Sequence, residues 1–358
     1  MNSLIYYNQL DIYTEDNIKK FPQLEKYSSF AKAIHSGIAV VDRSGTIELP
    51  YRTENLYPFP EWRTFTDTFK DIAIRRVLEI EKDVLSDPDT QPVLMYSGGI
   101  DSTLVASLII QYCSKEFKDR LLVILNEASI DEARDFYEKH IKRNFRMASS
   151  NRFEQYLNNK YKVITGEFAD NVFGSLTLKF SIDFFGSESI INDPYQKYAH
   201  TYFNRKINDS KLTDWFIDQI EPLIKTCPYE IKTWNDYLWY MNFAMKWQAV
   251  EFRILSHKEK EFAPDWNYLN NNLIHFWKTD EWEQWAVNNP DKKIGNTWTS
   301  YKQPAKDLIY EFAKDENYLL NKTKYPSLPG VFRYRRVNKA IDKDLNFLNE
   351  INIEDFIK

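Results

Sequence analysis

The chain has 358 residues, of which 43% are hydrophobic and 28% charged, and its formal net charge is −5. This length allows one large or two ordinary domains, and the composition is that of a globular protein. The acidic balance argues against a general nucleic-acid-binding surface. No apolar stretch reaches the roughly 20 residues that a membrane span needs. Because the N-terminus also lacks the parts of a secretory signal, we expect a cytoplasmic protein without membrane contact.

The only two cysteines, Cys113 and Cys227, have no CxxC partner. They predict neither a disulfide framework nor a zinc cluster, and we expect each to pack as a small apolar side chain. Two basic runs, at residues 139–143 and 333–336, are most simply solvated faces. A docking site for a phosphate or RNA backbone is the alternative for both runs.

In chain order, the first expected element is a β-hairpin. The apolar runs 38–41 and 46–49 flank a turn of Asp, Arg, Ser and Gly, which is typical of two paired strands. Pro58 and Pro60 then mark a linker. Apolar residues recur at helical spacing from residue 65 to about residue 85, which predicts an amphipathic helix.

Strands and helices alternate in the next part of the chain. Apolar runs predict strands at 93–96, 121–125, 145–148 and 162–165. Helices are expected at 102–113 and 151–158. A further helix is expected to begin at Ser129, which forms a capping box with Glu132. This alternation predicts an α/β fold, a parallel sheet with helices on both faces. After about residue 175 the pattern is helical and aromatic, with no strand expected.

These patterns suggest a division of the chain into three consecutive parts. We expect a small β-containing segment at 1–65, a main domain at 66–330 and a tail at 331–358. Within the main domain, a nucleotide half at 90–175 would be extended by a mostly helical, aromatic half at 176–330.

The clearest functional motif is Ser97-Gly98-Gly99-Ile100-Asp101-Ser102, between a predicted strand and a predicted helix. Such a loop gathers backbone N–H groups and the positive end of the helix dipole around one point, where an anion fits. Glycine permits close approach, and serine hydroxyls donate to phosphate oxygens. Asp101 would repel a bare phosphate, so its presence implies a bridging cation such as Mg²⁺. The Gly-Lys-Ser/Thr ending of a Walker loop is missing, so transfer of the γ-phosphate is not indicated.

A second candidate site follows the predicted strand at 162–165. The segment 166–174 opens with Gly166 and carries two carboxylates, Glu167 and Asp170, three residues apart. The carboxyl edge of a parallel sheet is where α/β proteins bind ligands. One carboxylate could hold a metal while the other handles protons, and a solvated turn is the alternative interpretation.

Both segments resemble known motifs. The loop resembles the SGGxDS signature of the N-type ATP pyrophosphatases, which include GMP, NAD and asparagine synthetases and tRNA-modifying enzymes. Residues 166–174 are similar to the GEGADELFGG motif of asparagine synthetase and β-lactam synthetase, and residues 245–253 and 306–324 show weaker similarity to later motifs. The resemblance spans roughly residues 65–330 and implies an adenine nucleotide alpha hydrolase-like fold.

The resemblance also implies an activity and residue roles. It implies an ATP-dependent, amide-forming ligase that adenylates a carboxylate or carbonyl oxygen, releases pyrophosphate, and releases AMP when an amine or ammonia attacks. The nucleotide would lie against Met95, Ser97, Gly98, Gly99, Ser102 and Gly166. Asp101 and Asp170 would bind Mg²⁺, and Glu167 would take the proton of the amine. Lys324 would neutralise phosphate charge, with Lys322 as its close rival.

Several departures from the family pattern bear on the substrate. Phe168, Asn171 and Ser175 replace a small residue, an acidic residue and a glycine of the family motif. The sequence begins Met1-Asn2 and has no cysteine before Cys113, so we expect no glutamine hydrolysis. The expected partners are a small-molecule acceptor and an amine or ammonia, which a separate ammonia-producing protein could supply.

Two other functions stay open at this point. One is modification of a nucleobase or tRNA, which Arg333, Arg335 and Arg336 and the abundant aromatic rings would serve. The acidic net charge and the missing CxxC pairs speak against it. The other is a non-catalytic ATP-binding protein that has kept the loop and lost the chemistry.

Overall fold

The computed structural model describes residues 2–34, 39–323 and 338–358. The chain forms two compact units: unit 1 contains Met1–Trp62, Gly174–His257 and Phe332–Lys358, and unit 2 contains Arg63–Phe173 and Lys258–Val331. The units are therefore built from non-consecutive segments, in contrast to the consecutive division expected above. The linker expected at Pro58 and Pro60 lies close to the first boundary between them.

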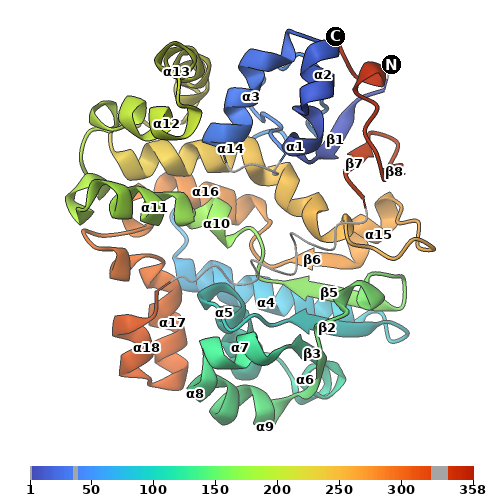
Figure 1. Ribbon diagram of the computed structural model, residues 1–358. Coiled ribbons are helices and arrows are strands. Elements are labelled where there is room, and N and C mark those ends of the chain that lie inside the picture. The colour runs from blue at the N-terminus through green and yellow to red at the C-terminus, as the bar shows by residue number, and fades with distance from the viewer. Residues whose placement is uncertain (1, 35–38, 324–337) are drawn as a thin grey trace. The chain divides into compact units, whose positions relative to one another are not determined.

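Unit 2 contains a five-stranded parallel sheet in the order β4-β3-β2-β5-β6, flanked by helices (Figure 1). The four predicted strands are present as β2 (Gln91–Met95), β3 (Leu122–Leu125), β4 (Arg146–Ser149) and β5 (Tyr161–Thr165). The α/β class with a parallel sheet is thereby confirmed. The expectation of no strand beyond residue 175 was wrong, because β6 (Leu273–His275) completes the sheet. Its three residues are all buried and show no alternation that could mark a strand.

The strand order determines where a ligand site can form in unit 2. From β2 the chain continues to β3 and β4 on one side, whereas β5 returns to the other side of β2. Val93 of β2 is consequently paired with Leu122 of β3 and with Val163 of β5. The order reverses between β2 and β5, and ligands of open α/β sheets bind at the carboxyl ends of such strand pairs.

The helices of unit 2 begin where polar side chains cap them. The predicted helix near residue 65 begins at Phe69, because the Thr68 side chain accepts from the N–H of Asp71. Asn126, rather than Ser129, caps the next predicted helix, and Ser129 completes the capping box from inside it. The expected helix at 151–158 is only a short 3₁₀ turn, Phe153–Tyr156. The helices are α4 (Phe69–Leu85), α5 (Ile100–Tyr112), α6 (Lys115–Arg120), α7 (Glu127–Glu132), α8 (Arg134–Phe136), α9 (Lys142–Asn144), α10 (Ala169–Phe173), α15 (Trp266–Asn271), α16 (Asp280–Asn288), α17 (Gln303–Ala313) and α18 (Glu316–Asn321).

Unit 1 is mostly helical. Its longest helix, α14 (Trp234–Leu255), is buried on nearly every side, and Trp234, Trp239 and Trp247 are fully buried within the unit's aromatic core. A small sheet joins the two ends of the chain, because β1 (Leu4–Tyr7) pairs with β7 (Ala340–Asp342), which pairs with β8 (Phe347–Leu348). The other helices are α1 (Gln9–Ile12), α2 (Glu15–Lys20), α3 (Leu24–Ala33), α11 (Leu176–Phe185), α12 (Ala199–Ile207) and α13 (Ser210–Ile224).

The predicted β-hairpin does not form in its described part, residues 39–50, where no strand is present. The backbone N–H groups of Val41 and Arg43 donate to the carbonyls of Met245 and Ala244 in α14 instead of to a partner strand. The turn is held by Asp42, whose carboxylate accepts from the N–H groups of Thr46 and Ile47. In the ranges that the structure describes, no helix combines the length and apolar character that crossing a membrane requires.

Candidate functional site

The loop between β2 and α5 is shaped by its serines. The Ser102 hydroxyl lies 3.0 Å from the Ser97 hydroxyl and accepts from the N–H of Ser97 at 3.1 Å, while the N–H of Gly99 donates to the Ser97 hydroxyl. Gly99 caps α5 without any side-chain hydrogen bond to the first turn. The N–H groups at the start of this 13-residue helix can therefore donate to an anion.

Gly98 is the position in the loop that requires glycine. Its φ of 74° lies in the left-handed region, and an added Cβ atom would lie 2.2 Å from the Ser129 carbonyl oxygen of α7. Gly99 has an ordinary φ of −71°, so its backbone conformation does not require glycine. The loop is thus seated directly against α7, with Gly98 at the point of closest approach.

The two sequence motifs meet in space. Because β2 and β5 are adjacent and parallel, the segments that follow them emerge side by side. A Cβ atom on Gly166 would lie 3.0 Å from the backbone nitrogen of Ser102 and 3.3 Å from the Cβ of Asp101. Gly166 therefore packs against the start of α5, as the sequence-based assignment of both segments to one site requires.

Asp101 and Asp170 converge on one cationic group, the ammonium of Lys302. The Nζ atom of Lys302 lies 2.6 and 2.7 Å from the two carboxylate oxygens of Asp101 and 2.9 Å from Oδ1 of Asp170. The Lys302 side chain is 1% exposed, whereas those of Asp101 and Asp170 are 25% and 37% exposed. The lysine is thus buried beneath two carboxylates that stay accessible to solvent.

The electrostatics of this trio favour a charged lysine. Burial opposes the charged form of Lys302, but the two carboxylates outweigh that penalty and raise its pKa above the usual lysine value. Burial and the nearby Asp170 likewise raise the pKa of the Tyr301 phenol, so that this group stays neutral and donates to Asp170 at 3.5 Å. Trp298 stacks on Tyr301 with its ring centroid 4.6 Å away.

Lys302 and Tyr301 are functional candidates that sequence reasoning missed. Lys302 adopts φ of 58°, which is uncommon for a side chain other than glycine and tends to occur at functional sites. It is separated from Asp101 by 201 residues and precedes α17, which packs against α5. No local pattern distinguishes Lys302 from the other 46 basic residues among the 47 lysines and arginines, so only the fold identifies it.

The three residues that differ from the GEGADELFGG motif, Phe168, Asn171 and Ser175, each have a structural explanation. Phe168 has φ of 75°, a conformation that glycine adopts without strain, and its buried ring lies 4.9 Å from the ring of His275. Asn171 is fully buried, where a carboxylate would carry a large desolvation cost. Ser175 caps α11 by accepting from the N–H of Thr177. Phe168 therefore combines an unfavourable backbone conformation with a well-packed ring.

The remaining predicted residues are placed as follows. Met95 ends β2 directly before the loop, and Glu167 is half-buried, with its N–H donating to the Thr165 hydroxyl. Lys322 donates to the carbonyl and the carboxylate of Glu132 in α7, and burial lowers its pKa. A Cβ atom on Gly98 would lie 3.1 Å from the Cβ of Glu132, so Lys322 is one residue removed from the loop. Lys324 lies outside the described residues, as do Arg333, Arg335 and Arg336.

The weaker motif at 245–253 lies in α14 and belongs to unit 1, whereas the loop and the segment after β5 belong to unit 2 up to Phe173. The basic run at 139–143 is partly neutralised, because Lys139 pairs with Asp135 and Lys142 with Glu138 at helical spacing. These pairs are typical of a solvated helix face.

Carboxylate oxygens such as those of Asp101 and Asp170 are the ligands that Mg²⁺ prefers. Within residues 2–34, 39–323 and 338–358, no cluster of three or more His, Cys, Asp or Glu side chains could enclose a metal ion. Asp101 and Asp170 form a pair whose oxygens already share one cationic group. One or two carboxylates, completed by waters and phosphate oxygens, are the usual protein ligands of Mg²⁺. The pair therefore fits a magnesium ion that arrives with a nucleotide.

Unit 2 thus brings together, at the reversal point of a parallel sheet, a Ser-Gly-Gly loop, a helix start without a side-chain cap and two converging carboxylates. Comparison of the chain with protein-family models and with curated proteins gave no match.

Proposed function

We propose that this protein is an ATP-dependent, AMP-forming ligase with an adenine nucleotide alpha hydrolase-like nucleotide unit. One observation carries the proposal: the loop after β2 and the segment after β5 meet at the reversal point of the sheet. There Asp101 and Asp170 both contact the ammonium of Lys302. Parallel α/β sheets bind nucleotides at this position. A cytoplasmic location is part of the same proposal.

The loop would hold the pyrophosphate part of ATP. Backbone N–H groups at the start of α5 and the hydroxyls of Ser97 and Ser102 would donate to phosphate oxygens. Gly98 and Gly166 allow the loop to pack in this conformation, since side chains at these positions would meet α7 and the start of α5. Met95 would lie against the nucleotide at the end of β2.

Positive charge would come from a magnesium ion and from two lysines. Asp101 and Asp170 would hold Mg²⁺, which when bound stabilises negative charge on the phosphates and on the leaving pyrophosphate. Lys302 lies beneath the same carboxylates and would keep them aligned while adding a fixed charge. Lys322 is ion-paired with Glu132, which lies next to the loop, and would be the second cationic side chain of the site.

The proposed reaction has two steps. An oxygen of the substrate carboxylate forms a bond to the α-phosphorus of ATP, and the bond to the bridging oxygen breaks to release pyrophosphate. The nitrogen of an amine or ammonia then attacks the acyl carbon, AMP leaves with the carboxylate oxygen, and Glu167 accepts the proton that the nitrogen loses. The ammonia could be free or supplied by a separate protein, and an amino group of the substrate itself would close a ring.

The test is nucleotide binding and cleavage by Asp101→Asn. We expect the wild type to bind α,β-methylene-ATP in the presence of Mg²⁺ and to release pyrophosphate from ATP with a suitable acid and amine. Asp101→Asn should weaken binding about tenfold or more and abolish pyrophosphate release, because the charge that holds the cation is lost. Asp89→Asn, on an exposed turn of the same unit, is the matched control and should change neither.

Two results would contradict the proposal. Pyrophosphate release that survives Asp101→Asn in a folded protein would place the chemistry elsewhere. Cleavage of ATP to ADP and phosphate would show that the loop serves a different phosphoryl transfer. Circular dichroism of both variants separates loss of function from loss of fold.

A non-catalytic ATP-binding protein is the second candidate, and one observation favours it. Lys302 already neutralises one of the two negative charges of Asp101 and Asp170, so the loop would bind a nucleotide with less need for a metal. This function predicts binding of α,β-methylene-ATP that is insensitive to removal of Mg²⁺, together with no pyrophosphate release across a panel of acids and amines.

A further inference from the structure

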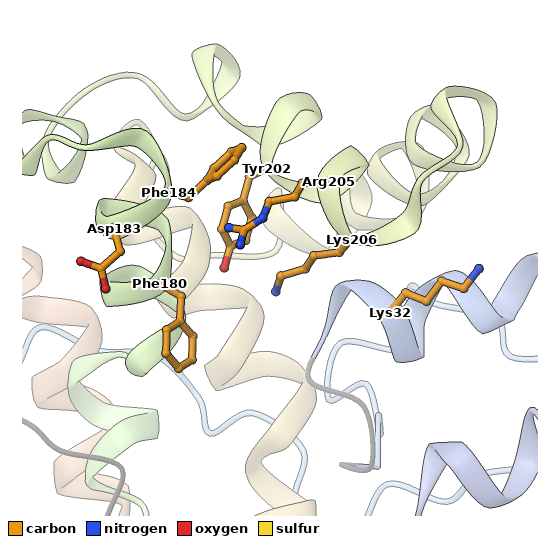
Figure 2. A pocket seen from close by; sticks show the side chains of 7 residues that line it. All are labelled: Lys32, Phe180, Asp183, Phe184, Tyr202, Arg205 and Lys206. Atoms are coloured by element: carbon orange, nitrogen blue, oxygen red, sulfur yellow. The ribbon is translucent and has the colours of Figure 1, made fainter.

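A hollow of about 620 Å³ lies within unit 1, between α11, α12 and α3 (Figure 2). All of its lining residues belong to unit 1, whereas the loop and the carboxylate pair belong to unit 2. Its size is within the usual range for small-molecule sites. The hollow is therefore distinct from the residues of the proposed nucleotide site.

One part of the lining is apolar and open to solvent. Phe180 and Phe184 are one turn apart on α11, and 44% and 37% of their surfaces are exposed. Most phenylalanines of this chain are buried, so two exposed rings on one side of a helix are notable. Exposed aromatic rings that border a hollow are typical of sites that bind an apolar group.

The other part of the lining is cationic. The Arg205 guanidinium stacks on the Phe184 ring at 4.4 Å, and the Lys206 ammonium lies 4.7 Å from the Tyr202 ring. Figure 2 shows the nitrogen-bearing ends of Arg205 and Lys206 close together, while the Lys32 ammonium points away from them. In the described residues Arg205 has no hydrogen-bond or carboxylate partner.

The acidic residue of the hollow does not neutralise these cations. Asp183 pairs with Lys179, one turn earlier on α11. Lys206 donates to the Ala33 carbonyl at 3.1 Å and keeps further donor capacity, since an ammonium group has three N–H bonds. These two adjacent cations repel each other, and burial together with the charge of Arg205 lowers the pKa of Lys206 to about 8.

We propose that this hollow binds a small organic acid whose carboxylate pairs with Arg205 and Lys206 and whose aromatic or branched apolar body lies against Phe180 and Phe184. A guanidinium stacked on a ring presents its donors in one plane, which suits bidentate pairing with a carboxylate. An anion would also relieve the repulsion between the two cations. The exposed rings would be covered by the apolar part of the same ligand.

The test is titration calorimetry of the full chain, without nucleotide, with 3-phenylpropionate and with its neutral analogue 3-phenylpropanamide. We expect the acid to bind at one site, and the affinity for the amide to be lower by a factor of about ten or more. Arg205→Gln and Lys206→Gln should each weaken binding of the acid about tenfold and leave the amide unchanged. Arg205→Lys keeps the charge but loses the planar donor pair, so its affinity for the acid should lie between those of the wild type and Arg205→Gln.

Lys211→Gln, an exposed lysine on α13, is the matched control and should have no effect. Equal affinity for acid and amide would overturn the proposal, as would binding that ignores Arg205→Gln and Lys206→Gln, or no binding of the acid at millimolar concentration. Inorganic phosphate that binds as well as 3-phenylpropionate would also overturn it, because the rings would then have no part in binding. Unchanged melting temperatures of the variants show that the fold is intact.

A pH series gives a second readout. The titratable and charged groups that line the hollow with Lys206 are Arg205 and Tyr202 on its own helix, Asp183 on α11, and Lys32 on α3. A bound carboxylate counters the lowered pKa of Lys206, so binding should take up protons near pH 8. Affinity should therefore fall as the pH rises through 8, and Lys206→Gln should remove that dependence. A dependence that survives the substitution would assign the titration to another group.

Discussion

Gly98 and Gly186 have nearly the same backbone conformation, with φ of 74° and 70°, but different surroundings. An added Cβ on Gly98 meets the Ser129 carbonyl at 2.2 Å, whereas nothing lies within 4 Å of one on Gly186. The left-handed conformation costs an L-residue about 1–2 kcal/mol. We expect Gly186→Ala to cost about that much, and Gly98→Ala distinctly more, since α7 must also move.

Thermal unfolding monitored by fluorescence measures the difference between these two variants. Gly98→Ala should also lose binding of α,β-methylene-ATP, because the loop would be pushed away from α7, whereas Gly186→Ala should keep it. Equal destabilisation by the two substitutions would show that the contact between Gly98 and Ser129 is not tight in solution.

The Lys302 ammonium is the cation that Asp101 and Asp170 share. Lys302→Met leaves two converging carboxylates without their shared cation, and it should cost less than the about 3–5 kcal/mol of a fully buried ion pair, because both carboxylates stay accessible to solvent. Mg²⁺ should restore part of the lost stability, because Asp101 and Asp170 can share it once the ammonium is gone. The wild type without nucleotide should respond less, since Mg²⁺ has to compete with Lys302.

The matched control for this prediction is Lys306→Met. Lys306 is buried on the same helical segment, but its ammonium donates to the Thr299 carbonyl and contacts neither Asp101 nor Asp170. Its variant should lose stability without gaining a response to Mg²⁺. If melting temperatures of Lys302→Met are the same with Mg²⁺ and with EDTA, the two carboxylates do not form a divalent cation site.

At the scale of elements, α7 is the helix that packs against the loop between β2 and α5. Asn126 caps α7 by accepting from the N–H of Ser129 at 3.0 Å, and the Ser129 carbonyl is the atom closest to Gly98. Removing such a cap costs about 1 kcal/mol. Asn126→Ala should therefore lower stability modestly and also weaken binding of α,β-methylene-ATP, because this helix becomes less ordered.

Thr233→Ala provides the comparison for Asn126→Ala. Thr233 caps α14 in unit 1 by accepting from the N–H of Asp236 at 3.1 Å, so its loss should cost about the same stability. Nucleotide affinity should be unchanged in that variant. Similar losses of affinity in both variants would mean that general destabilisation, and not the position of α7, governs binding.

The elements that the sequence predicts well are those whose signals are local. The strands at β2, β3, β4 and β5 are apolar runs flanked by helical patterns, and each is present within a few residues of its expected position. The hairpin was wrong because its backbone donors bond to α14, about 200 residues away, through contacts that no local pattern records. β6 was missed because three buried residues without alternation carry too little signal.

The candidate site divides in the same way. The loop and the segment after β5 are continuous motifs, so their proximity follows from the parallel sheet, and Gly166 lies against Asp101 in the structure. Lys302 reaches Asp101 across 201 residues and Asp170 across 132. A single lysine before α17 has no distinguishing spacing, and its role depends on how α17 packs against α5.

At the scale of the whole molecule, both compact units are assembled from distant segments of the chain. In unit 1, β1 near the N-terminus pairs with β7 near the C-terminus, with Leu4 opposite Asp342. The lining of the hollow in unit 1 likewise combines α3 with α11 and α12. Neither unit corresponds to one continuous stretch of the chain. A fragment that contains only the N-terminal or only the C-terminal half would therefore lack parts of both cores.

This organisation allows the two proposed ligands to be told apart by hydrogen exchange in one full-length protein. A ligand at a hundred times its Kd stabilises the state that binds it by about 2.7 kcal/mol, and slower exchange reports the segments whose opening it opposes. Mg²⁺ with α,β-methylene-ATP should slow exchange in 97–102, 166–173 and 298–306 of unit 2. 3-Phenylpropionate should slow exchange in 176–185 and 199–207 of unit 1.

The two variants described above connect each protection pattern to its site. Asp101→Asn should remove the protection by the nucleotide and keep that by the acid, and Arg205→Gln should do the reverse, because each substitution changes a contact inside one unit only. Nucleotide protection confined to 176–207 would contradict the assignment of ATP to the loop after β2. Acid protection confined to 97–102 would instead mean that the carboxylate occupies the phosphate site, and it would remove the basis for a separate site in unit 1.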